Sequence, residues 1–156
     1  MTYETPKYVK GELYIGAPLE GVLKNVRMAP EAKDHIGELQ AWNLETKKQV
    51  WMHKFPEMNW GPLLATGGDL LFAGGTNDRK FRAFDAKSGK VLWEYPASSG
   101  VTGIPTSFEV DGEQYVAVES GWGVDAQRMQ ARLDTFRNTK TEVPQGGVIW
   151  VFAVRN

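Results

Sequence analysis

The sequence contains no cysteine and only two histidines, His35 and His53. Without cysteine the chain can form neither a disulfide nor a thiolate site, although such a composition is compatible with any cellular compartment. The two histidines are isolated from each other, and we expect solvated or capping roles for them in preference to catalysis. The composition therefore gives no support to cysteine- or histidine-based catalysis.

The chain also lacks a dominant charge and a long apolar run. It carries 18 basic and 19 acidic residues, which gives a formal net charge of −1. Such a balance gives no electrostatic basis for binding nucleic acid or an anionic membrane. No apolar stretch approaches the roughly 20 residues of a membrane span. Residues 1–4 do not begin a secretory signal, so we expect any signal of a secreted parent protein to lie upstream.

What the sequence does contain is an internal repeat. An eleven-residue unit occurs at Ala41–Trp51 and again at Ala83–Trp93, a step of 42 residues. A period of about 40–50 residues with a strand–turn–strand core is typical of a β-propeller blade. The repeat therefore predicts an all-β fold built from propeller blades.

Each period is predicted to hold two hairpins. In the second copy of the unit, residues 81–84 form one strand, residues 85–90 the turn, and residues 91–93 the start of the return strand. Two apolar runs also flank a Gly/Asp turn in residues 63–73, and the same pattern recurs in residues 106–117. Two hairpins per period give the four strands of one blade.

The blades at the two ends are predicted to be partial. A third copy of the first strand begins at residues 147–152, and residues 9–16 resemble a hairpin of a preceding blade. About three blades result, whereas a closed ring needs at least about four. We therefore expect a segment of a larger propeller, or a subunit that completes a ring with another chain. Alone, it should self-associate or need a partner, because open blade faces and edges are exposed.

The chain holds six tryptophans, which fall into two groups. Four stand at repeat or strand positions and are expected to pack between blades: Trp42, Trp51, Trp93 and Trp150. Trp60 and Trp122 lie instead in loops beside glycine. A tryptophan in such a loop can line a pocket for a flat ligand, or it can simply pack the loop. The composition leaves both interpretations open.

Residues 125–136 depart from the β pattern. Met129, Leu133 and Phe136 recur at helical spacing, and Asp125 can cap the start, so we expect a short helix before the last strand. Its simplest role is to cover a face of the propeller. The alternative is that it shapes a substrate entrance or contacts a partner.

The second copy of the repeat carries the most specific motif. Residues Ala83–Trp93 match Ala-x-Asp-x-x-(Thr/Ser)-Gly-Lys-x-x-Trp at every fixed position. The chain thereby resembles the pyrroloquinoline quinone (PQQ)-dependent alcohol dehydrogenases, in particular the methanol/ethanol dehydrogenase group. The first copy departs from the motif with Asn43 for Asp and Lys47 for Gly, which predicts a differently built turn. The likeness extends through residues 60–61, 64–68, 77–85, 111–118, 120–123 and 145–152.

The resemblance implies that residues 1–156 are the carboxyl-terminal portion of an eight-bladed quinoprotein propeller. Enzymes of this group are periplasmic and bind PQQ on the propeller axis, with Ca²⁺ or a lanthanide at the quinone. A catalytic aspartate takes the proton of a small primary alcohol, hydride passes to the quinone, and electrons leave to a cytochrome c. The metal ligands and the catalytic aspartate belong to earlier blades, so no catalytic or metal-binding residue is expected here.

The resemblance also indicates which residues of this segment contact the cofactor. Trp60 matches a tryptophan that approaches PQQ, and Trp122 falls in a last-blade loop that places a tryptophan near it, with Gly123 adjoining. Asn59 could offer its amide to a PQQ carbonyl or carboxylate. The acids of the segment show no paired spacing of the kind a metal site needs: Asp69, Asp78, Asp85, Asp111 and Asp125.

Two further interpretations remain beside a segment of an alcohol dehydrogenase. One is a non-enzymatic propeller scaffold with quinoprotein-like repeats, since a fold does not determine a function. The other is a truncated piece without activity of its own. The loops of Trp60 and Trp122 favour the enzyme, because a scaffold would not need them. In every case we expect the isolated chain to be inactive.

Overall fold

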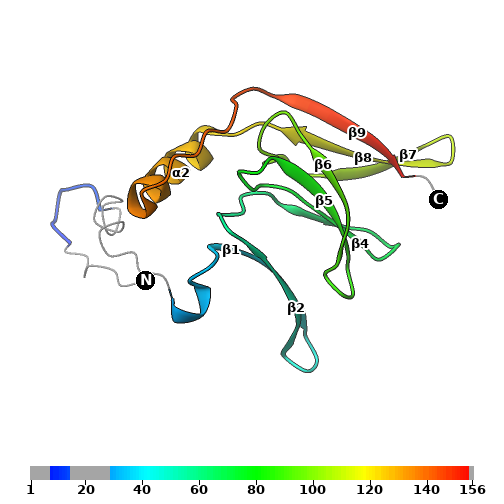
Figure 1. Ribbon diagram of the computed structural model, residues 1–156, viewed down its shortest axis with the longest axis horizontal. Helices are drawn as coiled ribbons and strands as arrows, with labels where there is room; N and C mark the ends of the chain where they lie inside the picture. The colour runs from blue at the N-terminus through cyan, green and yellow to red at the C-terminus, as the bar shows by residue number, and fades with distance from the viewer. Residues whose placement is uncertain (1–7, 15–28, 155–156) are drawn as a thin grey trace. The chain divides into compact units, whose positions relative to one another are not determined.

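The computed structural model describes residues 8–14 and 29–154, and the chain divides into two compact units, Met1–Lys33 and Asp34–Asn156 (Figure 1). In the first unit the Glu12 amide donates to the Val9 carbonyl at 3.2 Å, and a short 3-10 helix, η1, spans Pro30–Ala32. The expected hairpin at residues 9–16 is thus represented by a turn at Val9–Glu12, and residues 15 and 16 lie outside the described residues.

The described part of the second unit consists of antiparallel strands in three sheets, with one α-helix. The first sheet pairs β1 (Gly37–Asn43) with β2 (Lys48–Phe55). The second has the order β3-β4-β5-β6, formed by Leu63–Ala65, Leu70–Ala73, Lys80–Asp85 and Val91–Pro96. The third has the order β7-β8-β9, formed by Thr106–Val110, Glu113–Ser120 and Val148–Val154. Figure 1 shows β4, β5 and β6 side by side, and the all-β prediction of a partial propeller is confirmed.

The four-stranded sheet is the one complete blade among the described residues, because the sheets before and after it have two and three strands. The register of β5 with β6 shifts between Ala83 and Phe84, and that of β1 with β2 shifts between Ala41 and Trp42. A bulge bends and twists the strand that carries it. The two copies of the repeat therefore share this irregularity as well as their strands.

The turns of the two copies are also built alike, contrary to the expectation from Asn43 and Lys47. Asp85 Oδ1 accepts the Ser88 amide at 2.7 Å, and Asn43 Oδ1 accepts the Thr46 amide at the same distance. Gly89 has φ 71°, and Lys47 adopts the same left-handed conformation at φ 56°. The prediction was wrong because the asparagine amide oxygen replaces the carboxylate oxygen, while lysine tolerates the left-handed φ at a cost in strain.

The repeat explains how the first two sheets are joined. Trp51 on β2 donates its indole N–H to the Ala86 carbonyl at 2.9 Å, and its ring lies against Gly89 in the next blade. A methyl group at residue 89 would lie 2.6 Å from the ring. Glycine is therefore needed twice at this position, for the left-handed φ and for the close approach of the indole.

The other repeat tryptophans pack less uniformly than expected. Trp150 stands edge-on to Tyr95 of the neighbouring sheet, with ring centroids 5.0 Å apart. Trp93 contacts Phe81 and Phe152 but remains 38% exposed. Trp42 is 54% exposed, so its predicted packing between blades is wrong for the described residues. The repeat position alone does not bury a ring, because burial also needs a neighbouring sheet.

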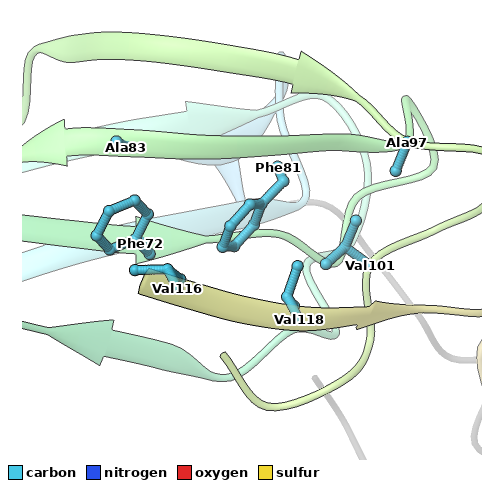
Figure 2. Packing of buried hydrophobic residues seen from close by; sticks show 7 residues of the cluster. All are labelled: Phe72, Phe81, Ala83, Ala97, Val101, Val116 and Val118. Carbon is cyan, nitrogen blue, oxygen red and sulfur yellow. The ribbon is translucent and has the colours of Figure 1, made fainter. Parts of the chain in front are cut away.

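Two hydrophobic clusters hold the three sheets together. The larger joins the second and third sheets and is drawn in Figure 2; its members are Phe72, Phe81, Ala83, Ala97, Val101, Val116 and Val118. The smaller joins the first and second sheets through Leu39, Phe55, Ala73 and Phe84. Burial of apolar surface between the sheets is thus the main stabilising interaction.

The expected helix is present as α2 (Val124–Arg137), directly after β8. Its N-cap is Gly123, not Asp125, and no side chain caps the first turn. Its buried residues are Ala126, Gln130, Leu133 and Asp134, while Phe136 is 48% exposed. The apolar spacing predicted the helix correctly but not its buried face, half of which is polar.

Both histidines differ from the solvated groups expected from the sequence. His35 is buried, with Nδ1 2.7 Å from Asp34 Oδ1 and Nε2 2.6 Å from Glu38 Oε1. His53 is half-buried and stands edge-on to Phe55 and Phe84. The hydrogen bonds to Asp34 and Glu38 raise the pKa of His35, whereas burial lowers the pKa of His53. Both side chains stabilise the fold from within.

These opposite shifts predict opposite pH dependences. The contribution of His35 to stability should be complete below its unfolded pKa of about 6.5 and lost as pH rises through its raised folded pKa. The contribution of His53 should instead be lost as pH falls below about 6.5. Urea unfolding at pH 5.5, 7.0 and 8.5 would compare wild type with His35→Gln and with His53→Gln. A wild-type advantage over His35→Gln that stays constant with pH would refute this assignment.

Candidate functional site

The structure brings together the two loop tryptophans predicted to bind a ligand. Trp122 is 2% exposed and forms a cluster with Ala126 of α2 and with Val143. Trp60 packs against this cluster. Two loops far apart in the sequence therefore meet at one small cluster. We call Trp60, Trp122, Ala126 and Val143 the indole cluster.

Trp122 is fixed by the segment that follows β6. Its backbone N–H donates to Ser99 Oγ at 3.0 Å, and that hydroxyl donates to the Pro144 carbonyl at 2.6 Å. The ring lies so close to Gly100 that a side chain at that residue would overlap it. Ser99 is itself 2% exposed, so this anchor is shielded from water.

Trp60 is fixed mainly through its backbone. Its N–H donates to the Gly75 carbonyl at 2.9 Å, and Gly75 has φ 93°. Asn59 Oδ1 accepts the Gly61 amide at 3.0 Å. The predicted ligand atom of Asn59 is therefore partly engaged, since its oxygen holds its own loop and only the Nδ2 group could serve a ligand.

Hydrogen bonding distinguishes the two cluster tryptophans from three of the four tryptophans expected to pack between blades; the fourth, Trp93, is 38% exposed. The indole N–H groups of Trp42, Trp51 and Trp150 donate to Gln40 Oε1, the Ala86 carbonyl and Ser120 Oγ. The indole nitrogens of Trp60 and Trp122 are buried and have no acceptor among the residues that the structure describes. A buried donor without a partner costs about 1–3 kcal/mol, so these two require an explanation beyond packing.

A hollow of about 450 Å³ adjoins the cluster at Trp122 and Gly123. Its other lining residues are Thr102, Gly103, Glu119, Gly121, Gly146 and Gly147. Two hydrogen bonds fix its wall: the Gly121 amide donates to the Gly100 carbonyl at 2.7 Å, and Thr102 Oγ1 donates to the Gly121 carbonyl at 2.6 Å. Neither Asn59 nor Trp60 is among the residues that line it.

Reasoning from the sequence missed Thr102, Glu119 and four of the five glycines of this wall. The available signal was the density of glycine in residues 100–103, 121–123 and 146–147. Glycine lets a ligand approach the backbone closely and exposes N–H groups to it. Without the fold, nothing in the sequence placed these three segments beside one another.

The donors present fit a planar, oxygen-rich anion such as PQQ. The indole N–H groups of Trp60 and Trp122 have no acceptor among the described residues, and glycine-rich backbone lies beside Trp122. A quinone with several carboxylates supplies acceptor oxygens and a flat face for indole contact. The exposed carboxylate of Glu119 is the one lining charge of the wrong sign, and its exposure keeps it solvated.

The acids of the segment are engaged in local structure. Asp85 holds the repeat turn, while Asp69 and Asp111 take left-handed conformations in hairpin turns. Asp78 binds Arg82 and Thr76. Burial tends to raise the pKa of Asp78, but hydrogen bonds from Arg82 and Thr76 outweigh burial and hold that pKa below its usual value. Within the described ranges, no three His, Cys, Asp or Glu side chains are grouped for metal binding.

None of the helices that the structure describes is long and apolar enough to cross a membrane.

The comparisons with known proteins agree with the fold. Residues 21–116 match the PQQ family, described as the glucose/ethanol/alcohol dehydrogenase β-propeller domain. The chain is 40% identical over 151 residues to the quinoprotein alcohol dehydrogenase PedE of Pseudomonas putida, covering 97% of this chain and 22% of that protein. It is 42% identical over 103 residues to the 1-butanol dehydrogenase (cytochrome c) of Thauera butanivorans, covering 66% of this chain and 14% of that protein.

A solved structure supports the same relation. A europium-containing methanol dehydrogenase superposes with a TM-score of 0.67 at 29% identity, over 96% of this chain and 28% of that one. The chain thus spans about a fifth of the length of the curated relatives it matches. Its repeat, its sheets and the family match over residues 21–116 lead to one conclusion: the chain belongs to the quinoprotein (PQQ-dependent) alcohol dehydrogenase family.

Proposed function

We propose that this chain is part of a PQQ-dependent alcohol dehydrogenase that oxidises primary alcohols to aldehydes, and that it supplies one side of the PQQ pocket. The observation that carries the proposal is the pair of buried indole N–H groups, on Trp60 and Trp122, that have no acceptor in the described part of a chain of this family. A structural tryptophan would be expected to have an acceptor, as Trp51 does.

The residues of the segment would bind and orient the cofactor and leave the chemistry to it. PQQ, when bound, supplies a two-electron acceptor for the hydride of the alcohol. Trp60 and Trp122 would donate their indole N–H groups to its oxygens, and the backbone near Gly123 would allow close approach. The α2 residues behind Trp122 would exclude water, which strengthens each of these hydrogen bonds.

The complete enzyme needs parts that lie outside this segment. The catalytic base and the ligands of a Ca²⁺ or lanthanide ion would come from other blades of the same propeller, of which residues 1–156 form one portion. The acceptor of its electrons would be a cytochrome c, as the name of the Thauera relative states for that protein, and its location would be the periplasm. The europium in the methanol dehydrogenase neighbour supports the lanthanide alternative.

Phenylalanine substitutions test the proposed pocket in the complete enzyme. Trp122→Phe and Trp60→Phe keep an aromatic ring and remove the unpaired N–H. Each should weaken PQQ binding about tenfold, since a hydrogen bond to a charged acceptor contributes ~1.5 kcal/mol or more. The free energy of unfolding of the ligand-free protein should change little, because removal of the costly unpaired N–H offsets the packing lost with the smaller ring. Calorimetric titration with PQQ and urea unfolding measure the two effects.

Trp51→Phe is the matched control. It breaks the hydrogen bond to Ala86 and should therefore lower stability by about 1 kcal/mol while leaving PQQ affinity unchanged. If Trp60→Phe and Trp122→Phe also bound PQQ as the wild type does, the segment would not form part of the pocket. A propeller scaffold without a cofactor would then be the better interpretation.

The isolated chain should not oxidise alcohols, because a base and a metal site would have to come from other blades. Purified chain would be supplied with PQQ, Ca²⁺ or a lanthanide, ethanol and a dye acceptor. We expect turnover no higher than in the blank without protein. PQQ- and metal-dependent turnover well above that blank would show that the segment contains a complete active site.

A further inference from the structure

We propose that Glu57, held by Arg137 and Gln130 of α2, is a positioning residue for Trp60, so that one helix fixes both indoles of the pocket. The inference rests on the proposed function for its consequence, PQQ binding. It assigns a role to α2 beyond covering a face of the propeller.

Glu57 lies between the end of β2 and the loop of Trp60, three residues before the indole. Its side chain is 15% exposed, and its Oε1 forms an ion pair with Arg137 Nη1 in the last turn of α2. The same guanidinium nitrogen donates to the Pro56 carbonyl at 3.4 Å. Arg137 therefore binds the Pro56 carbonyl and the Glu57 carboxylate in the segment that leads to Trp60.

Gln130 provides the second contact. It is 1% exposed, and its Nε2 lies 3.4 Å from Glu57 Oε2 and 3.0 Å from Asp134 Oδ1. Asp134 is in turn fixed by the Thr141 amide at 2.8 Å and by the hydroxyls of Thr139 and Thr141. The Gln130 amide is thus a pre-ordered donor held by Asp134, and a pre-ordered donor loses little entropy when it binds its partner.

The loop has little freedom on its other sides. A methyl group at Gly37 would lie 2.5 Å from the Glu57 carbonyl oxygen and 3.1 Å from the Asn59 nitrogen, so β1 lies directly against this backbone. The Trp60 amide is hydrogen-bonded to Gly75. The contact of Glu57 with α2 restrains the loop further, beside these backbone contacts and the packing of Trp60 in the indole cluster.

The same helix also contacts Trp122, which the segment after β6 anchors. Ala126, in the first turns of α2, packs against Trp122 within the indole cluster, and Arg137 in its last turn holds Glu57. A rigid helix thereby sets the spacing of the two unpaired N–H donors. Pre-organised donors bind a rigid planar ligand better than mobile ones, because less freedom is lost on binding.

The test uses the complete enzyme labelled with 5-fluorotryptophan, with the Trp60 resonance assigned from Trp60→Phe. Glu57→Gln removes the ion pair with little change in shape. It should shift or broaden the ligand-free ¹⁹F resonance of Trp60, leave that of Trp93 unchanged, and raise the dissociation constant for PQQ about 3–10-fold. Arg137→Met should reproduce these effects, and Arg137→Lys should restore most of the affinity.

Arg128→Met is the matched control, because Arg128 is an exposed arginine of the same helix whose partner Asp125 is also exposed. It should leave the Trp60 resonance and PQQ affinity unchanged. Wild-type resonance and affinity in both Glu57→Gln and Arg137→Met would overturn the inference, as would equal changes in Arg128→Met. If the Trp60 resonance moved but neither wild type nor variants bound PQQ, the positioning role would stand and the proposed function would fail.

Discussion

Replacing Phe81 with alanine should lower the free energy of unfolding by about 3–5 kcal/mol, the largest effect expected from a single side-chain truncation in this segment. Phe81 is 1% exposed on β5, and its ring stacks on Phe72 and on Phe152 with centroids 5.8 Å apart in each case. Figure 2 shows it in the middle of the cluster between the second and third sheets. The truncation would leave a cavity at this interface and remove ring contacts to both sheets.

Urea unfolding of the complete enzyme measures the effect, and Phe108→Ala is its control. Phe108 lies on β7, is 41% exposed, and stacks only on Tyr115 among the aromatic pairs of the described residues. Its truncation should cost about 1 kcal/mol or less, because water already reaches the ring. Equal losses in the two variants would show that the larger cluster is not the core of the interface.

Gly89→Ala should cost about 2–5 kcal/mol and disturb the contact between the first two blades. A left-handed φ costs a residue with a side chain roughly 1–2 kcal/mol, and forcing a methyl into a packed site costs roughly 1–3 kcal/mol. Both terms apply, because residue 89 has φ 71° and the new methyl would meet the Trp51 ring. Urea unfolding gives the loss, and the emission of Trp51 should shift as its ring is displaced.

The first copy of the repeat offers a control of opposite sign. Lys47 occupies the equivalent turn position at φ 56°, so Lys47→Gly relieves strain and should raise stability by up to about 1 kcal/mol. If Gly89→Ala were as stable as wild type, neither strain nor the indole contact would be important at this turn. A loss of stability in Lys47→Gly would show that backbone entropy outweighs strain there.

The same turn shows why the two sets of tryptophans must be distinguished by their partners. Trp51 finds both a flat contact at Gly89 and an acceptor at Ala86 within the next blade. Trp122 finds the flat contact at Gly100 but no acceptor among the described residues. Trp51 thus uses its indole N–H in folding, whereas the N–H of Trp122 would serve a ligand in the proposed pocket.

Sequence patterns alone were enough to predict the fold. The 42-residue step between Ala41 and Ala83 predicted the blades, and the paired apolar runs predicted both hairpins of the complete one. It also predicted α2 and, through its resemblance to a known family, the family itself. These features are local, because a strand or a turn depends on residues a few positions apart. The same reasoning singled out Trp60 and Trp122, whose binding role stays a prediction.

Which of these residues contact one another, and through which groups, became known from the packing of the sheets. Trp42 and Trp51 belong to the same repeat copy, yet within the described ranges Trp42 is exposed and Trp51 packs against the next blade. Gln130 and Arg137 would be read from the sequence as surface residues, yet they hold Glu57 beside the loop of Trp60. Burial, an unpaired N–H group and an ion pair between distant segments all depend on how the sheets pack. A local sequence pattern does not encode the contacts between segments that lie far apart in the chain.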